Sequence, residues 1–170
     1  GYDALIALSI ATREMDDKYG TEYNRRFLDY LKEYQERDWC GACAQTDMKG
    51  DRIKRPHEQE DPDAYVHIVE ERDDGIVVRG AKISITMAAS ADELLVLPTR
   101  AMGPEDRDYA VAFAIPADWD GVRLITRPVW VRERKYIKAP FAEMGGSDSF
   151  IIFDNTFIPK ERVFMCKEWE

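Results

Sequence analysis

Apolar residues recur at helical spacing over the first part of the chain. The residues that share one helical face are Tyr23, Phe27, Tyr30, Leu31 and Tyr34. An earlier helix is predicted from Tyr2 to Lys18 and is expected to stop at Gly20, because glycine readily adopts the left-handed conformation found at helix ends. Thr21 is then the predicted N-cap of the second helix.

The first predicted helix is apolar from its first turns, where Ala4, Leu5, Ile6 and Leu8 lie. An apolar helix face needs a partner surface that covers it. We therefore expect this partner surface to come from chain outside the sequence. We interpret residues 1–37 as the end of a helical domain and residues 38–170 as a second, β-rich domain.

From Trp39 onward the pattern changes to short β-branched or aromatic runs separated by Gly, Pro and Asp. Strands are predicted at 65–70, 75–82, 93–98, 109–115, 122–126, 149–153 and 162–166. Because no helical segments alternate with these strands, the pattern excludes a parallel doubly wound sheet and favours an antiparallel barrel or sandwich. The polar segments 45–63 and 128–147 are long enough to be functional loops.

A hairpin is predicted around Asp73-Asp74-Gly75, because Asp-Gly readily supplies the positive φ angles of a tight turn. The second strand of this hairpin continues through Lys82–Met87 into small residues at 88–91. A flat cofactor can approach the backbone closely at such residues, although the pattern alone more simply predicts an edge strand.

Composition narrows the class of protein. A content of 45% hydrophobic and 34% charged residues is typical of a folded globular domain. The net charge of −9 argues against nucleic-acid partners, which require clustered cations. No apolar run has the roughly 20 residues of a membrane span, and no signal peptide is recognisable, so we expect a cytoplasmic protein without membrane partners.

The loop from Gln45 to Arg52 is dense in hydrogen-bonding groups. Its Thr46 hydroxyl and backbone amides can hold the edge of a cofactor ring. The cations that can meet phosphates are Lys49, Arg52, Lys54 and Arg55. The alternative is an ordinary solvated turn, since the glycine-rich nucleotide-binding motifs are missing.

Other candidate groups give weaker signals. Cys40 and Cys43 have a two-residue spacing, but no second pair completes a zinc site; with Cys166 they are expected to be reduced, packed thiols. The only histidines, His57 and His67, lie in no recognisable nucleophile motif, so a hydrolase triad is unsupported.

Asp148 follows Gly145-Gly146-Ser147 and precedes an apolar strand. It is a candidate acid or base, whereas an aspartate at such a position more often satisfies backbone donors.

At these loops the sequence resembles the flavoprotein family that unites 4-hydroxybutyryl-CoA dehydratase with the 4-hydroxyphenylacetate 3-hydroxylases. The resemblance covers nearly the whole chain. The matching stretches are Lys18-Tyr19-Gly20-Thr21 with Tyr23, Thr46-Asp47, Lys49-Gly50-Asp51-Arg52, Asp61-Pro62-Asp63, Ile68-Val69-Glu70, Asp74 to Lys82, Asp108-Tyr109-Ala110-Val111, Phe153-Asp154-Asn155, Phe157-Ile158-Pro159, Arg162, Phe164, Cys166 and Glu168.

The resemblance implies an acyl-CoA-dehydrogenase-like fold, in which an antiparallel β-barrel middle domain lies between helical domains and the C-terminal helices drive formation of a homotetramer. This chain then holds the end of the first domain and all of the barrel. The residues implied to bind FAD are Gln45, Thr46, Asp47, Met48, Lys49, Gly50, Asp51, Arg52, Ser84, Ile85, Thr86 and Met87. Those implied to lie beside a CoA substrate are Asp51, Arg52, Ile53 and Lys54.

The two branches of the family imply different chemistry. The dehydratase branch implies radical dehydration of a hydroxyacyl-CoA, or isomerisation of vinylacetyl-CoA, with FAD and a [4Fe-4S] cluster whose ligands lie outside this chain. The hydroxylase branch implies hydroxylation of a phenol by reduced flavin and oxygen. In the dehydratase branch the Thr86 hydroxyl is implied to point toward the reactive nitrogen of the flavin, and Asp148 is the second candidate catalytic residue.

The stretch Lys49-Gly50-Asp51-Arg52 and the pair Gly145-Gly146 resemble the dehydratase branch more closely. Asp148 departs from that branch, which carries glutamate there, and matches the hydroxylases. A third hypothesis is a β domain that only packs or assembles. Under either catalytic hypothesis we expect the 170 residues alone neither to hold FAD tightly nor to catalyse.

Overall fold

The computed structural model describes residues 1–48, 50–127 and 147–170. Two helices, α1 (Tyr2–Tyr19) and α2 (Tyr23–Glu36), precede the strands β1 (Gly41–Ala44), β2 (His67–Arg72), β3 (Gly75–Thr86), β4 (Glu93–Val96), β5 (Val111–Pro116), β6 (Val122–Thr126), β7 (Asp148–Pro159) and β8 (Val163–Cys166). Short 3-10 turns connect them: η1 (Pro56–Glu58), η2 (Pro62–Ala64), η3 (Ala88–Ser90), η4 (Pro104–Tyr109) and η6 (Lys160–Arg162). Each predicted strand has a counterpart, so the mainly β fold with N-terminal helices is confirmed.

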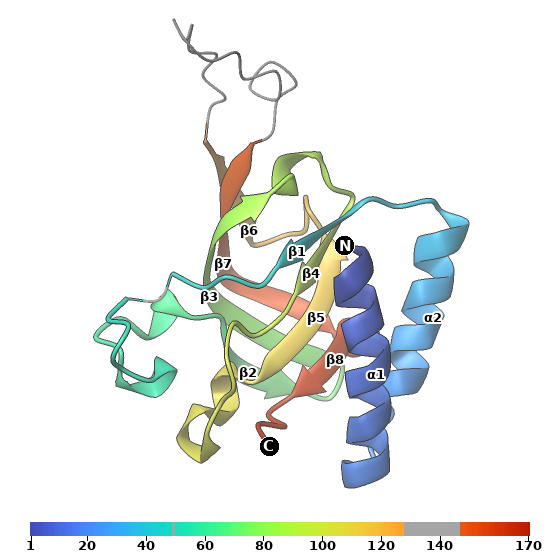
Figure 1. Ribbon diagram of the computed structural model, residues 1–170, viewed down its shortest axis with the longest axis horizontal. Helices are drawn as coiled ribbons and strands as arrows, with labels where there is room; N and C mark the ends of the chain where they lie inside the picture. The colour runs from blue at the N-terminus through green and yellow to red at the C-terminus, as the bar shows by residue number, and fades with distance from the viewer. Residues whose placement is uncertain (49, 128–146) are drawn as a thin grey trace, which may run out of the picture.

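The strands form two separate four-stranded sheets, with the orders β1-β4-β5-β8 and β2-β3-β7-β6 (Figure 1). The second sheet is antiparallel throughout, but β1 pairs with β4 in parallel. One link between the sheets is an isolated antiparallel bridge between Asp47 and Lys82. The sheets do not close into one hydrogen-bonded ring in the part of the chain that is described, so the predicted antiparallel barrel is not confirmed.

The main core lies between the two sheets and includes Leu94, Val96, Phe113, Ile151 and Phe153, all at most 2% exposed. Helices α1 and α2 cover the other face of the β1-β4-β5-β8 sheet, as Figure 1 shows. This double coverage explains why β4 and the first five residues of β5 are buried at every position rather than at alternate ones.

The expectation that chain outside the sequence covers the first helix is wrong for Ala4, Leu5 and Leu8, which are buried within this chain. Leu5 and Leu8 are 9% and 3% exposed, and both belong to a core cluster with Phe27 of α2 and Phe164 of β8. The rings of Phe27 and Phe164 meet edge to face, with centroids 5.4 Å apart. Ile6 remains exposed.

The junction between the helices confirms one prediction and corrects another. Gly20 ends α1 in the left-handed conformation, with φ of 68°, as predicted. Thr21 does not cap α2, because its hydroxyl donates to Asp16 instead. The Asp16 carboxylate accepts the backbone N–H groups of Tyr23 and Asn24 at 2.8 and 3.0 Å, so the cap comes from the preceding helix.

The β2–β3 hairpin forms as predicted, but not for the predicted reason. None of the residues Asp73, Asp74 and Gly75 has a positive φ. Gly75 is needed instead because β7 passes closely: a Cβ atom there would lie 2.1 Å from the Ile158 carbonyl oxygen. Strand β2 pairs with β3 only at residues 75–79, so residues 82–86 pair with β7 on one side and, at Lys82, with an isolated bridge from Asp47 on the other, and the edge-strand prediction for 82–87 is not contradicted.

Candidate functional site

The two residues predicted to be catalytic meet at one end of the second sheet. The register of β3 and β7 places Thr86 opposite Asp148. The Thr86 hydroxyl donates a hydrogen bond of 2.8 Å to the Asp148 carboxylate, and the pair faces solvent. A hydroxyl and a carboxylate held together at an exposed strand end can orient a polar ligand atom and transfer a proton to or from it.

The backbone around this pair is strained. Ser84 and Met87 have φ angles of 55° and 65°, in the left-handed region that non-glycine residues seldom adopt. The register of β3 against β7 shifts between Lys82 and Ile85, and the Met87 N–H donates to the Ser147 carbonyl at 2.9 Å. Such conformations persist only where the surrounding structure holds them, and they concentrate at functional sites.

A buried ion pair holds the loop that begins at Gln45. Lys82 Nζ lies 2.8 Å from Asp47 Oδ1, and both side chains are 2% exposed. Lys82 also donates to the carbonyl oxygens of Gln45 and Leu97 at 2.9 and 2.7 Å. Burial lowers the pKa of Lys82, while the Asp47 carboxylate opposes that shift.

The Asp47 side chain is therefore used for structure. Its carboxylate also accepts the Thr99 hydroxyl at 2.6 Å and the Val66 N–H at 3.2 Å. The loop backbone pairs with β3, since Ile83 N donates to Thr46 O at 2.8 Å. The sequence analysis did not identify Lys82 as a structural residue. Its even-numbered position in the strand, shared with the apolar Ile76 and Val78, did indicate that its side chain points to the buried face.

The predicted substrate residues lie at the tip of the loop between β1 and β2. Their backbone is organised by the Gln59 amide, which accepts the Asp51 N–H at 2.9 Å and donates to the Asp51 carbonyl at 2.9 Å. Gly50 is required here because its φ is 43° and a Cβ atom would lie 2.2 Å from Gln59 Oε1. The result is a compact tip on which Ile53 is 93% exposed.

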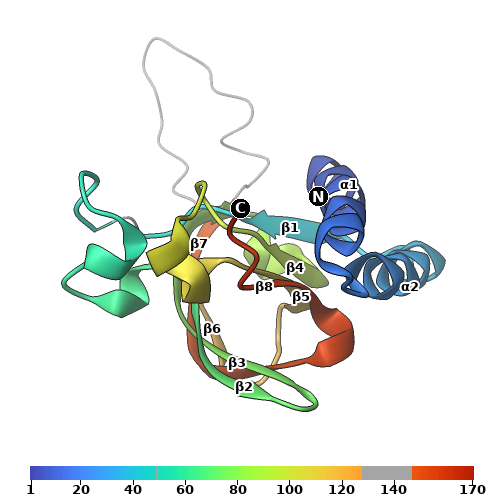
Figure 2. The same cartoon turned by 90° about the horizontal axis from the view of Figure 1, so that it is seen from below.

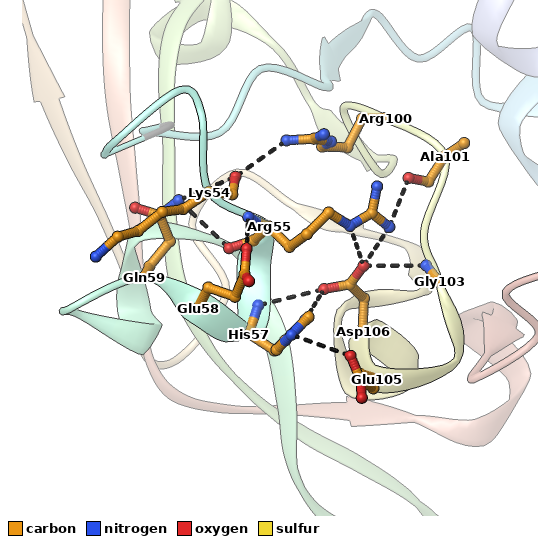
Figure 3. Close-up of polar contacts among 10 residues, drawn as sticks. All are labelled: Lys54, Arg55, His57, Glu58, Gln59, Arg100, Ala101, Gly103, Glu105 and Asp106. Atoms are coloured by element: carbon orange, nitrogen blue, oxygen red, sulfur yellow. Dashed lines mark hydrogen bonds and ion pairs between the residues drawn. The ribbon is translucent and has the colours of Figure 1, made fainter.

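A cluster that the sequence analysis did not predict anchors this tip to the segment before β5 (Figure 3). At its centre is Asp106, whose side chain is 1% exposed. The carboxylate accepts two hydrogen bonds from the Arg55 guanidinium and one each from the N–H groups of Gly103 and His57, at 3.0 and 3.2 Å. Its fifth contact is His57 Nδ1, at 2.7 Å. Forty-nine residues separate His57 from Asp106, so no local motif connects them.

The His57 ring lies between two carboxylates. Besides Asp106 at Nδ1, Glu105 Oε2 lies 3.3 Å from Nε2. The hydrogen bond with Asp106 raises the pKa of His57 above its usual value of 6.5. Conversely, hydrogen bonds from His57 and Arg55 hold the pKa of Asp106 below its usual value despite burial.

The structure brings some predicted residues together and separates others. Gln45, Thr46 and Asp47 lie against β3, and Thr86 lies against Asp148. The tip Asp51–Lys54 instead belongs to the teal segment that projects from the side of the sheets in Figure 1, away from the end where β7 begins. Lys49, the pair Gly145-Gly146 and most of the predicted loop 128–147 lie outside the described residues.

A hollow of about 490 Å³ lies between this projecting loop and the outer face of the second sheet. Its walls include Met48, Gly50 and Asp63 from the loop and Arg79 and Ile152 from the sheet. Arg79 and Asp63 form an ion pair across it. The hollow therefore offers a surface with both polar and apolar groups beside residues predicted to bind a cofactor.

Over residues 1–48, 50–127 and 147–170, no group of three or more His, Cys, Asp or Glu side chains is placed to hold a metal ion. Cys40, Cys43 and Cys166 are free thiols, and burial raises the pKa of Cys166 to about 11. No described helix is both long and apolar enough to cross a bilayer.

Similarity to known proteins covers the whole chain. The chain is 44% identical over 175 aligned residues to the 4-hydroxybutyryl-CoA dehydratase/vinylacetyl-CoA-Δ-isomerase of Clostridium aminobutyricum. The alignment covers 100% of this chain and 36% of that protein. An oxygen-tolerant archaeal 4-hydroxybutyryl-CoA dehydratase from N. maritimus superposes with a TM-score of 0.88 at 38% identity, covering 99% of this chain and 34% of that one.

The FAD complex of the oxygenase component of 4-hydroxyphenylacetate 3-monooxygenase superposes with a TM-score of 0.78 at 27% identity, over 96% of this chain and 34% of that one. A glutaryl-CoA dehydrogenase shares the fold at 18% identity, with a TM-score of 0.53. The chain thus spans about a third of the length of these relatives. The sequence signature of the 4-hydroxyphenylacetate 3-hydroxylase N-terminal family matches residues 1–165, and the chain belongs to that family.

Proposed function

We propose that this chain is part of an FAD-dependent enzyme and supplies the flavin-facing sheet end and a substrate-binding loop. The observation that carries the proposal is the exposed Thr86–Asp148 pair, in a chain 44% identical to a 4-hydroxybutyryl-CoA dehydratase. The solved monooxygenase complex with FAD supports the cofactor. FAD supplies the electron-transfer chemistry when bound, and the protein supplies binding and orientation.

The described residues fit a flavin at this position. Thr86 lies three residues beyond Ile83, whose N–H donates to the Thr46 carbonyl oxygen, so both threonines lie toward the same end of β3. A fused ring system can contact Gln45–Thr46 on one side and Thr86 on the other. Small residues follow at Ala88–Ser90, of which Ala89 and Ser90 are exposed and Ala88 is buried.

In this arrangement Asp148 orients the Thr86 hydroxyl and is the candidate acid or base. The Thr86 proton is held by Asp148 in the structure, so the hydroxyl oxygen keeps its lone pairs for a ligand donor. The hollow beside Met48 and Arg79 supports a further contact surface for the same cofactor. The buried Lys82–Asp47 ion pair keeps Gln45–Thr46 in place, since Lys82 also donates to the Gln45 carbonyl oxygen.

We infer that the substrate is a CoA ester and that the tip Asp51–Lys54 contacts it. Arg52 and Lys54 are exposed cations on either side of the exposed Ile53, a combination that suits phosphate groups beside an apolar chain. The proposed reaction is dehydration of a hydroxyacyl-CoA, with a [4Fe-4S] cluster bound by residues outside this chain. We also propose the division into residues 1–37 and 38–170, and a homotetrameric full-length protein.

The alternative is a flavin-dependent aromatic monooxygenase. Asp148 favours it, because the hydroxylase branch resembled by the sequence carries aspartate at this position. The similarity to the monooxygenase oxygenase component, at a TM-score of 0.78, supports the same reading. A β domain without catalysis is the third candidate, and bound flavin would exclude it.

The full-length protein decides among these candidates. Purified without oxygen, it is expected to carry FAD together with bound iron and acid-labile sulfide, and to convert 4-hydroxybutyryl-CoA to crotonyl-CoA. Oxygen-dependent hydroxylation of 4-hydroxyphenylacetate with supplied reduced flavin, and no bound iron or sulfide, would identify the monooxygenase. A colourless protein that takes up no FAD would overturn both.

A further inference from the structure

The loop tip Asp51–Lys54 is held at its C-terminal end by residues that follow it directly in the chain. Arg55 and His57 both bind Asp106, which belongs to η4 and whose carboxylate lies between their side chains (Figure 3). Two backbone contacts extend the anchor, since Arg100 donates to the Lys54 carbonyl and Arg55 donates to the Ala101 carbonyl, each at 3.3 Å. In Figure 2 the two segments, teal and yellow, lie side by side, away from both helices.

We propose that Arg55, His57 and Asp106 form a clamp of positioning residues, which holds Asp51–Lys54 in the conformation that receives the substrate. The role in substrate binding rests on the proposed function; the clamp itself rests on the contacts. The tip has its own internal order through Gln59, so the clamp sets where the tip sits rather than how it folds.

Burial makes the Asp106 carboxylate an effective anchor. A buried carboxylate is costly unless it is paired and hydrogen-bonded. The groups that bind the two carboxylate oxygens of Asp106 belong to Arg55, His57 and Gly103. Moving the tip away would leave that carboxylate without its cations. The tip and η4 are therefore expected to open together or not at all.

The clamp depends on the charge of His57. Each ring nitrogen faces a carboxylate oxygen, Asp106 at 2.7 Å and Glu105 at 3.3 Å. The charged imidazolium donates to both, whereas the neutral ring has one donor and turns a lone pair toward the other carboxylate. The other charged groups facing the ring are Glu58, from the same turn, and Arg55, across Asp106.

The sign of the pH dependence follows from the raised pKa of His57. A group whose pKa is higher in the folded state contributes fully below its unfolded value, here 6.5, and that contribution is lost as pH rises through the folded value. The clamp is therefore closed below the unfolded pKa and loosens as the pH rises through the raised pKa of folded His57.

Hydrogen exchange of the full-length protein tests the clamp without any substrate. After correction for intrinsic exchange rates, protection of peptides spanning 50–60 is expected to fall as pH rises through the folded pKa of His57. His57→Asn keeps a donor for Asp106 but cannot titrate, so it should abolish this pH dependence while keeping partial protection. His67→Asn replaces the other histidine of the chain and should leave the pH dependence unchanged.

Kinetics of the same variants test the link to substrate. His57→Ala is expected to raise KM for the CoA ester by about 3- to 10-fold with kcat within about 2-fold, because only uniform binding is lost. His57→Asn should restore part of the KM. If His57→Ala leaves both exchange and KM unchanged in an active enzyme, the clamp is wrong. If exchange responds as expected but no CoA ester binds, the clamp holds and the proposed function fails.

Discussion

Strand β3 carries two polar pairs four residues apart that have the same contact distance and opposite surroundings. Lys82 lies 2.8 Å from Asp47, and Thr86 lies 2.8 Å from Asp148. The first pair is 2% exposed on both sides and fully surrounded by partners. The second faces solvent at the strand end, beside strained backbone.

The difference shows how one strand can serve as both scaffold and working surface. Lys82 and Asp47 hold the Gln45–Thr46 backbone against β3, so their contribution is to stability and shape. Thr86 is exposed and Asp148 is half-buried, so we expect this pair to contribute little to stability while it stays accessible to a ligand. Substitutions along β3 and at a third aspartate should separate these roles.

The largest effect is expected for Lys82→Met. The change removes the cation and leaves Asp47 buried with neutral donors alone, which costs about 3–5 kcal/mol when one partner of a buried ion pair is lost. The free energy of unfolding, from urea titration of the full-length protein, measures it. The double variant Lys82→Met/Asp47→Asn should recover part of the loss, because the unpaired charge is gone. A change below about 1 kcal/mol in the single variant would show that the pair is not structural.

The next effect is expected for Gly80→Ala, two residues before Lys82. Gly80 has a φ of 125°, and a Cβ atom would lie 2.4 Å from the Tyr65 carbonyl oxygen, so the neighbouring backbone must move. We expect a loss of about 3 kcal/mol in unfolding free energy. Gly20→Ala is the matched control: its φ is also positive, at 68°, but no atom lies within 4 Å of the added Cβ. Its cost should be limited to about 1–2 kcal/mol for the left-handed conformation. Equal losses would contradict the steric argument.

Local periodicity was enough to predict the elements, because helix and strand patterns depend on near neighbours. The stop of α1 at Gly20 and the seven predicted strands followed from it. The errors concern contacts between distant residues. Leu5 and Leu8 belong to a core cluster with Phe164. Glycine is needed at position 75 because the backbone of Ile158, more than 80 residues away, lies too close for a side chain. Closure of the sheets depends in the same way on distant pairing, and the barrel that the resemblance implies is not confirmed over the described residues.

In the candidate site, too, single residues could be identified from the sequence, but contacts between distant residues could not. Asp148 was named from its position before an apolar strand and Thr86 from the family resemblance, but their hydrogen bond depends on the β3–β7 register across 62 residues. The burial of Lys82 was indicated by its position on the same strand face as apolar residues. His57 and Asp106 had none, because a turn and a 3-10 segment carry no period from which a side-chain contact can be predicted.

A third aspartate, Asp16, is half-buried like Asp148 but holds backbone groups in place like Asp47. Asp16 is partly buried and caps α2 through Tyr23 N and Asn24 N. Asp16→Ala should lower the unfolding free energy by about 1 kcal/mol. Thr21→Ala removes one hydrogen bond to the same carboxylate and leaves both backbone bonds in place, so its effect should be smaller. The reverse order in urea titrations would restore Thr21 as the cap.

The smallest effect on stability is expected for Thr86→Val, which keeps the shape and removes the hydroxyl at an exposed position. The unfolding free energy should change by no more than about 0.5 kcal/mol, the usual range for surface substitutions. The flavin is expected to respond far more: its absorption spectrum and reduction potential should shift, and turnover should fall about 10- to 100-fold if the hydroxyl contacts the reactive ring.

The pair can be tested as a unit with Asp148→Asn and the double variant. If Asp148 acts by orienting the Thr86 hydroxyl, the losses in turnover will not add, because either change already breaks the shared hydrogen bond. Additive losses would mean that each side chain meets the ligand separately. An unchanged flavin spectrum in all three variants, in a protein that still binds FAD, would move the flavin site elsewhere on the surface and leave β3 as a scaffold at both positions.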